Sequence, residues 1–283
     1  MTRATTTASR RKQVPERATA RSHVKRLPIW AQSVLLLVAV LAVWQFVSGR
    51  LVDPFYLPAP SEIVTSLWLS AVDGSLWANL WTTLQETMIG FCIGATAALV
   101  AGVIFGRSPR VAAVLDPFLV ALNATPRVAL APLFVVWFGI GLLSKVILVI
   151  TMVFFIVFYN TFQGVRSVDA TYIRVATVMG ASQRQIFRTV ILPAATPLIV
   201  LGLKLSIPFA LIGAVIGEFI ASSAGLGFQI KLASNTYDTA GTMAGIFVLM
   251  AVAVLIDLAL NRLARRILFW QPESAERTTS STM

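Results

Sequence analysis

Hydrophobic residues in this chain gather into six long segments, separated by shorter stretches that hold most of the charged and polar residues. Each segment approaches the roughly 20 residues that a helix needs to cross a bilayer. We therefore predict an all-α polytopic membrane protein with six transmembrane helices. The third segment is the most irregular, because Pro126, Arg127 and Pro132 interrupt its apolar run. The segments cover residues 29–47, 84–105, 119–138, 144–162, 195–221 and 241–260.

The overall composition also favours a membrane protein. Hydrophobic residues make up 57% of the 283 residues, charged residues only 12%, and the mean hydropathy is +0.80. A soluble globular chain carries about a quarter charged residues. The balance therefore excludes a soluble enzyme, a disordered chain, a collagen-like fibre and a disulfide-rich secreted domain. Because Cys92 and His23 are the single cysteine and histidine, an intrachain disulfide and a histidine-pair metal site are excluded, and we predict no metal and no cofactor.

The positive charge of the chain is distributed unevenly. The net charge is +11, from 23 basic and 12 acidic residues. With the N-terminus inside, 18 of the 23 basic residues fall in inner segments, and three, Arg50, Lys145 and Lys231, fall in outer segments. Cytosolic loops of membrane proteins carry such an excess of Lys and Arg. We therefore predict a multi-pass protein of the cell membrane with both termini cytosolic, and no nucleic-acid partner.

The two ends of the chain differ from its apolar middle. Residues 1–26 are polar and basic and lack hydrophobic periodicity, which predicts a disordered cytosolic arm. Residues 27–270 form the predicted transmembrane domain, and residues 271–283 a polar C-terminal tail. A secretory signal peptide does not fit, because the charged region is long and no small-residue cleavage site follows the first apolar segment.

Small residues recur at every fourth position along the second predicted span. On a helix this spacing forms one continuous stripe, and such stripes let membrane helices approach closely. We expect a helix-packing face, and the alternative is the ordinary enrichment of glycine in membrane helices. The stripe consists of Gly90, Gly94, Ala98, Gly102 and Gly106.

Three charged residues and one proline within the spans are candidates for a translocation path. Charged groups inside a membrane often mark such paths, and Pro208 favours a kink in the fifth span. Snorkelling of Lys204 and Glu218 to the membrane interfaces is an alternative, as is a purely structural bend. The candidates are Arg127, Lys204, Pro208 and Glu218.

The inner segment between the fourth and fifth spans predicts two short helices joined by a glycine turn. Asp169 is placed to cap the first helix, and Gly180 to end it in a left-handed conformation. Ser182 and Gln185 have the spacing of a capping box, which begins a second helix. Pro193 marks the return to the membrane. Such an element presents a compact surface to a soluble partner, and the alternative is an interfacial connector without a partner.

This segment resembles the EAA motif of inner-membrane permeases of binding-protein-dependent ABC importers. The resemblance rests on Arg174-Val175-Ala176, Gly180-Ala181-Ser182 and Ile191-Leu192-Pro193. Further stretches are similar to the sulfonate, nitrate and taurine branch of these permeases, and the resemblance covers residues 27–270. They are Leu57-Pro58-Ala59-Pro60-Ser61, Asp73-Gly74-Ser75-Leu76-Trp77, Leu130-Ala131-Pro132-Leu133-Phe134, Trp137-Phe138-Gly139-Ile140-Gly141, Asn160-Thr161, Gly164-Val165-Arg166-Ser167-Val168-Asp169 and Gly225-Leu226-Gly227.

The resemblance implies a type I importer permease with a cytosolic coupling helix in residues 168–193. Its expected partners are two cytosolic ATP-binding subunits, a second permease copy, an extracytoplasmic solute-binding protein and membrane lipid. Arg174 stands where the family usually has an acid, which reverses a charge at the expected ATPase interface. The residues implied in ATPase coupling are Tyr172, Arg174, Val175, Ala176, Met179, Gly180, Ala181, Ser182 and Pro193.

No enzymatic activity is predicted for the chain itself. It contains no Gly-Lys dipeptide and hence no P-loop for ATP, so ATP hydrolysis is expected in the partner subunit. The implied solute is a small anion such as a sulfonate, taurine or nitrate, with a vitamin precursor or aromatic carboxylate as the alternative. A stand-alone secondary transporter would need ion-coupling carboxylates near the midplane. An intramembrane enzyme would need paired carboxylates, a metal motif or a nucleophile elbow, and these are missing.

Overall fold

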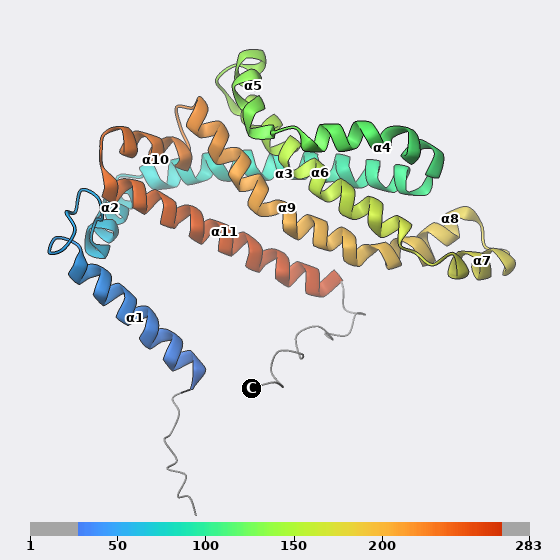
Figure 1. The fold of residues 1–283 in the computed structure, drawn as a ribbon, viewed down its shortest axis with the longest axis horizontal. Coiled ribbons are helices and arrows are strands. Elements are labelled where there is room, and N and C mark those ends of the chain that lie inside the picture. Colours follow the sequence, from blue (N-terminus) through green and yellow to red (C-terminus); the bar gives the residue numbers. More distant parts are fainter. Residues whose placement is uncertain (1–27, 268–283) are drawn as a thin grey trace, which may run out of the picture. The chain divides into compact units, whose positions relative to one another are not determined.

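The computed structural model of this chain describes residues 28–267, and every regular element in that range is a helix (Figure 1). The predicted arm over residues 1–26 and the tail over residues 271–283 lie outside the described residues. The α-helices are α1 (Ile29–Val47), α2 (Pro60–Val72), α3 (Ser75–Arg107), α4 (Pro109–Ala124), α5 (Ala131–Phe138), α6 (Leu142–Arg166), α7 (Ala170–Val178), α8 (Gln183–Ile186), α9 (Leu192–Ile220), α10 (Leu226–Asn235) and α11 (Thr239–Ile267), with a 3-10 helix η1 (Arg127–Leu130) and a π-helix η2 (Phe187–Ile191).

Five helices, α1, α3, α6, α9 and α11, are long and apolar enough to cross a membrane. A sixth candidate crossing is a bent pair, Pro117–Ala124 and Arg127–Phe138, whose axes differ by 76°. The bend follows from the sequence, because a residue before proline is driven out of the helical region and Thr125 before Pro126 is extended. The structure confirms the all-α polytopic prediction, and the third predicted span, which Pro126, Arg127 and Pro132 interrupt in the sequence, is this bent pair.

The described chain divides into two units, with the boundary between Val43 and Trp44. The first unit contains most of α1, whose bounds agree with the predicted first span. None of the α1 side chains is buried. The second unit contains α2 to α11 and holds the features described below.

Helices α3, α6 and α9 form the core of the second unit, with α6 packed against both of the others. The larger buried side chains of the core come from α6, while α3 and α9 contribute alanines. This division lets the two outer helices lie close to α6. The buried core residues are Ala95 and Ala98 from α3, Val149, Val153, Val157 and Phe158 from α6, and Ala210 and Ala214 from α9.

The small-residue stripe of α3 faces α6. A Cβ atom added at Gly90 would lie 2.5 Å from the Cβ of Val149, and one added at Gly102 would lie 2.7 Å from the Cβ of Thr161. Gly94 and Gly106 meet α6 in the same way, and Ala98 between them is fully buried. The backbones of α3 and α6 therefore approach so closely that side chains at these glycines have no room.

A second row of glycines lies on α9, and sequence reasoning did not single it out as a packing face. Gly202, Gly213 and Gly217 meet Asn160, Val149 and Lys145 of α6. The rows on α3 and α9 thus hold α6 between two small-residue faces.

The two ends of the second unit carry different short helices. Figure 1 shows α7 and α8 at one end of the long helices and α2 and α10 at the opposite end. Helix α10 packs on α9, α11 and α3, and α2 packs on α11 and α3. The predicted coupling residues and Glu218 lie toward these two ends, Arg127 lies at the start of η1, and Lys204 and Pro208 lie along α9.

Candidate functional site

The loop between α6 and α9 folds into a helical hairpin, which consists of α7, the turn at residues 179–182 and α8. Asp169 caps α7, with its side-chain Oδ1 accepting a hydrogen bond from the Thr171 backbone N–H at 2.7 Å. This bond, helped by the Thr171 hydroxyl, holds the pKa of the Asp169 carboxyl below its ordinary value of 3.8. A negative charge at a helix N-terminus also interacts favourably with the helix dipole.

The turn of the hairpin depends on Gly180. Its φ of +81° is left-handed, a conformation that glycine adopts without steric cost. The Gly180 N–H donates to the Thr177 carbonyl at 3.0 Å, and the Ala181 N–H donates to the Ala176 carbonyl at 3.0 Å. These two bonds form a Schellman motif, which satisfies the free carbonyls at the end of α7.

The second arm of the hairpin leads directly into a membrane-spanning helix. Ser182 and Gln185 form the predicted capping box, in which the Ser182 N–H donates to Gln185 Oε1 at 2.8 Å. One turn of α8 is followed by η2 and then by α9, whose first turn contains Pro193. Pro193 has no N–H to donate in the helical hydrogen-bond pattern. The π-helix η2, whose turn is wider than that of an α-helix, comes just before it. The hairpin is thus continuous with α9.

The hairpin carries an exposed apolar surface. Val178 is 89% exposed and Met179 81%, and Tyr172 and Val175 are exposed beside them. Of the other predicted coupling residues, Arg174 and Ser182 are exposed, and Ala176, Ala181 and Pro193 are half-buried. Sequence reasoning missed Val178, although its spacing of three residues from Val175 already places the two on one helix face.

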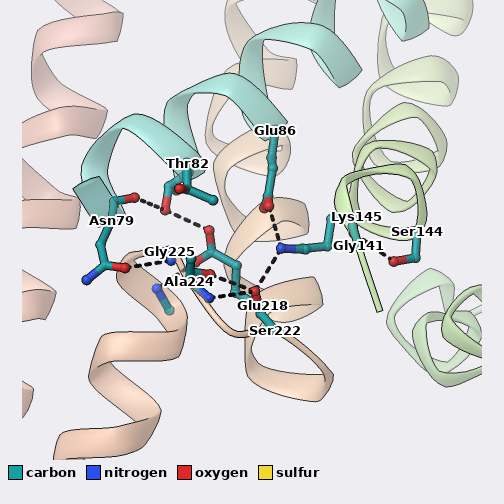
Figure 2. A network of polar contacts seen from close by, with 12 residues as sticks. Asn79, Thr82, Glu86, Gly141, Ser144, Lys145, Glu218, Ser222, Ala224 and Gly225 are labelled. Atoms are coloured by element: carbon teal, nitrogen blue, oxygen red, sulfur yellow. Dashed lines mark hydrogen bonds and ion pairs between the residues drawn. The ribbon is translucent and has the colours of Figure 1, made fainter. Parts of the chain in front are cut away.

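A cluster of three charged side chains lies at the opposite end of the bundle, and we call Glu86, Lys145 and Glu218 the charge cluster (Figure 2). Lys145 Nζ lies 2.5 Å from Glu86 Oε1 and donates to Ser222 Oγ at 2.8 Å. All three charged side chains are almost fully buried. The prediction that Lys145 belongs to an outer segment is wrong, because it lies in α6 against Gly217 of α9.

Glu218 anchors the turn between α9 and α10. Its carboxylate accepts hydrogen bonds from the Thr83 hydroxyl at 2.7 Å and from the Gly227 N–H at 2.6 Å. Gly225 has a φ of +111°, and a Cβ atom there would overlap the Glu218 carboxyl group. The snorkelling alternative for Glu218 is wrong, because its side chain is fully buried and bonded within the protein.

Polar groups around this turn extend the network to α3. The Thr83 hydroxyl also accepts from the Leu226 N–H at 2.8 Å. Figure 2 shows Asn79 beside Gly225, where Asn79 Oδ1 accepts from the Gly225 N–H at 2.8 Å. These contacts explain why α3 begins at Ser75, well before the predicted start of the second span. Asn79 and Thr83, in the first turns of α3, thus accept hydrogen bonds from backbone N–H groups at the start of α10.

Arg127 lies at the break between α4 and η1. Its guanidinium stacks over the Phe155 ring at 4.6 Å and donates to the Asn123 carbonyl at 3.2 Å. Its Nε is buried without a hydrogen-bond partner, and within the described residues no carboxylate pairs with it. Its guanidinium also donates to Asn123 Oδ1, so the described partners of this cation are Asn123 and an aromatic ring.

Lys204 and Pro208 lie on α9, which continues as one helix through Pro208. Lys204 is half-buried and Pro208 is exposed. No hydrogen bond or ion pair in the described part of the chain joins any two of the four predicted path residues. No group of three His, Cys, Asp or Glu within residues 28–267 is placed to hold a metal ion.

Known proteins are similar to this chain in sequence and in fold. The chain is 37% identical over 243 residues to the putative aliphatic sulfonates transport permease protein SsuC of Bacillus subtilis, covering 86% of this chain and 88% of that protein. It is 34% identical over 247 residues to the taurine transport system permease protein TauC of Escherichia coli, covering 85% and 90%. The fold is similar to the MetNI methionine ABC transporter in inward-facing conformations, with a TM-score of 0.60 and 20% identity over 68% of this chain and 97% of that chain.

Family membership follows from a match that is longer than half of the chain. Residues 90–269, from the α3 glycine stripe to the end of α11, match the family described as Binding-protein-dependent transport system inner membrane component. The match includes the helical hairpin and two members of the charge cluster, Lys145 and Glu218. This chain therefore belongs to that family and is a multi-pass membrane permease of a binding-protein-dependent ABC importer.

Proposed function

We propose that two copies of this chain form the membrane path of an importer for a small sulfonate-type anion, and that the helical hairpin docks on a separate ATP-hydrolysing subunit. The exposed apolar surface of the hairpin is the observation that carries this proposal. Val178 and Met179 are among the most exposed large apolar side chains of the described residues. Apolar side chains beyond the ends of the membrane helices favour burial by a protein partner.

The hairpin is built to transmit a displacement. Its first helix is capped by Asp169, its turn is closed by the Schellman motif, and its second arm starts with a capping box. The second arm then runs through η2 into α9, which packs along α6 in the core. A movement of the ATPase against the hairpin would therefore reach the transmembrane bundle through rigid elements, and would shift the population between two packings of the bundle.

The exposed face of α9 supports a path between two copies. Leu201, Leu205 and Ile212 are exposed there, and Lys204 and Pro208 lie among them. A lysine that faces lipid within a span is unfavourable, so such residues usually face a protein partner or a water-filled cavity. A second copy of this face and the path along it would satisfy that requirement.

The anion is inferred from the relatives and from Arg127. The two relatives named above are designated permeases for aliphatic sulfonates and for taurine. Arg127 adds a cation without a carboxylate partner at the broken span. A sulfonate group can accept charge-assisted hydrogen bonds from a guanidinium. We propose that both termini and the hairpin lie in the cytosol, because most basic residues fall in the same set of connecting segments, and that the solute-binding protein binds at the α2 and α10 end.

Val178→Asp tests the docking of the hairpin. The side chain is exposed, so the fold should persist, and co-purification with the co-expressed ATPase subunit should be lost together with ATP-driven transport. Val72→Asp is the matched control for co-purification, because Val72 is an exposed valine at the end of α2, at the opposite end of the bundle from the hairpin (Figure 1). A folded Val178→Asp protein that still binds the ATPase and transports normally would refute the docking assignment.

The solute requires a separate measurement. Proteoliposomes with the permease, the ATPase and the cognate binding protein should take up labelled taurine or an alkanesulfonate when ATP is supplied. Uptake of a vitamin precursor with no sulfonate uptake would contradict the proposed solute class while leaving the docking result intact.

A further inference from the structure

The charge cluster contains two acids and one base in a space closed to water. Glu86, Lys145 and Glu218 come from α3, α6 and α9, and each is at most 5% exposed. If all three were ionised, the cluster would carry one uncompensated negative charge. An unpaired buried charge is strongly unfavourable, and two carboxylates that share a site do not both ionise readily.

The hydrogen bonds distinguish the two carboxyl groups. Glu218 receives a donor on each oxygen, from Thr83 and from Gly227, which suits a carboxylate. Glu86 receives Lys145 on Oε1 alone, and its Oε2 is buried with no hydrogen-bond partner. An ionised Glu86 would therefore leave a charged acceptor unsatisfied, whereas a protonated carboxyl group supplies a donor at that position.

The acceptor for such a donor is the Glu218 carboxyl group, because Glu218 is bonded to Thr83, which lies three residues before Glu86 on the same face of α3. Lys145 from α6 and Glu218 from α9 are the charged groups of the described residues that face Glu86. Helix α10 contributes backbone N–H groups, and its Lys231 donates to the Phe219 carbonyl at 2.6 Å instead. One added proton makes this cluster neutral and satisfies its unpaired oxygen.

We propose that the charge cluster is a proton-binding site, in which Glu86 holds one proton on Oε2 at neutral pH and donates it in a hydrogen bond to the Glu218 carboxylate. Lys145 donates to the other oxygen of Glu86 and to Ser222. The site is distinct from the hairpin and from the proposed anion path, and it does not depend on either. The proton joins α3 to α9, next to the turn that carries α10.

Infrared spectroscopy of the purified full-length protein in nanodiscs tests the proposal. At neutral pH the spectrum should contain the carbonyl stretch of a protonated carboxylic acid, with the shift in heavy water that such a group shows. Glu86→Gln should remove this band. Glu62→Gln is the matched control, because Glu62 is an exposed glutamate of α2 outside the cluster, and it should leave the band in place.

Thermal unfolding of two variants supplies a second readout. Glu86→Gln should leave the midpoint unchanged, because an amide imitates a protonated carboxyl group, accepting from Lys145 and donating to Glu218. Glu218→Gln should lower the midpoint, because its amide nitrogen would face either the Thr83 or the Gly227 donor. The proposal is overturned if the wild-type protein lacks the band, if the band survives Glu86→Gln, or if both substitutions lower the midpoint equally.

Discussion

Lys145 of α6 donates a hydrogen bond to Glu86 of α3, with 2.5 Å between Nζ and Oε1, inside a bundle that buries both side chains. The pair exists because Gly217 of α9 leaves room for the lysine side chain. It joins two long helices next to the turn that Glu218 anchors. Polar contacts between buried side chains therefore stabilise this end of the bundle, whereas close apolar packing stabilises its centre.

Removing the lysine charge should destabilise the protein strongly. Lys145→Met leaves a buried negative charge without a cation, and breaking a buried pair in this way costs about 3–5 kcal/mol. Chemical unfolding in detergent measures the loss. Lys231→Met is the control, because the Lys231 side chain is exposed and donates to a backbone carbonyl. The Lys231→Met protein should therefore lose far less stability. Equal losses for the two variants would argue against the importance of the pair.

A methyl group in the α3 and α6 contact should also destabilise the bundle. At Gly102 a Cβ atom would lie 2.7 Å from the Thr161 Cβ and 3.1 Å from the Phe158 carbonyl oxygen, so the two helices must separate. We expect Gly102→Ala to cost about 1–3 kcal/mol, as overpacking usually does. Gly141→Ala is the control, since nothing lies within 4 Å of that position and its φ of −165° suits any residue. Unfolding midpoints that coincide for the two variants would disprove the tight contact.

Substitutions of Gly180 should impair the hairpin through the backbone conformation of this residue and not through a lack of space for a side chain. A Cβ atom there meets nothing within 4 Å, but a φ of +81° is unfavourable for side chains and most of all for branched ones. Gly180→Val should therefore distort the turn and reduce ATP-driven transport. Gly180→Asn should retain most activity, because asparagine tolerates the left-handed region. Transport and ATP hydrolysis stimulated by the binding protein provide the measurement, and similar activity in both variants would contradict the role of the turn.

The cap of α7 gives a prediction about local order and pH. Asp169→Ala should speed amide hydrogen exchange in α7, whereas Asp169→Asn should preserve protection, because asparagine is also a good N-cap. The charged cap is fully present above the ordinary carboxyl pKa of 3.8 and is lost only as pH falls through the lowered pKa of the folded state. Exchange of a peptide covering α7 that is insensitive to Asp169→Ala at neutral pH would rule out the cap.

Arg127 should contribute to transport and not to docking. Arg127→Met removes a cation that has no carboxylate partner, and the loss of a charge-assisted bond of about 1.5–3 kcal/mol corresponds to roughly a tenfold to hundredfold fall in transport of the anion. ATPase co-purification should be unchanged. Arg50→Met is the control, because Arg50 stacks on Phe46 away from the broken span. Normal sulfonate uptake by the Arg127→Met protein would exclude Arg127 from the path.

The amino-acid sequence by itself determined the helical class, the spans and the caps of the hairpin. These features depend on residues that are close in the chain. Apolar periodicity reports on a single helix, the Ser182 and Gln185 spacing forms a box within one turn, and Gly180 ends α7 through its own backbone. Membership of the permease family followed from the same local motifs, and the family match bears it out.

Only the tertiary structure decided which distant residues meet. Sequence reasoning counted Lys145 among the outer basic residues, yet α3 and α9 bury it against Glu86. The exposure of Val178 likewise depends on how whole helices pack. The physical reason is that a buried charge is stable only beside its partner, and the partner is set by helix contacts that no short stretch of sequence contains.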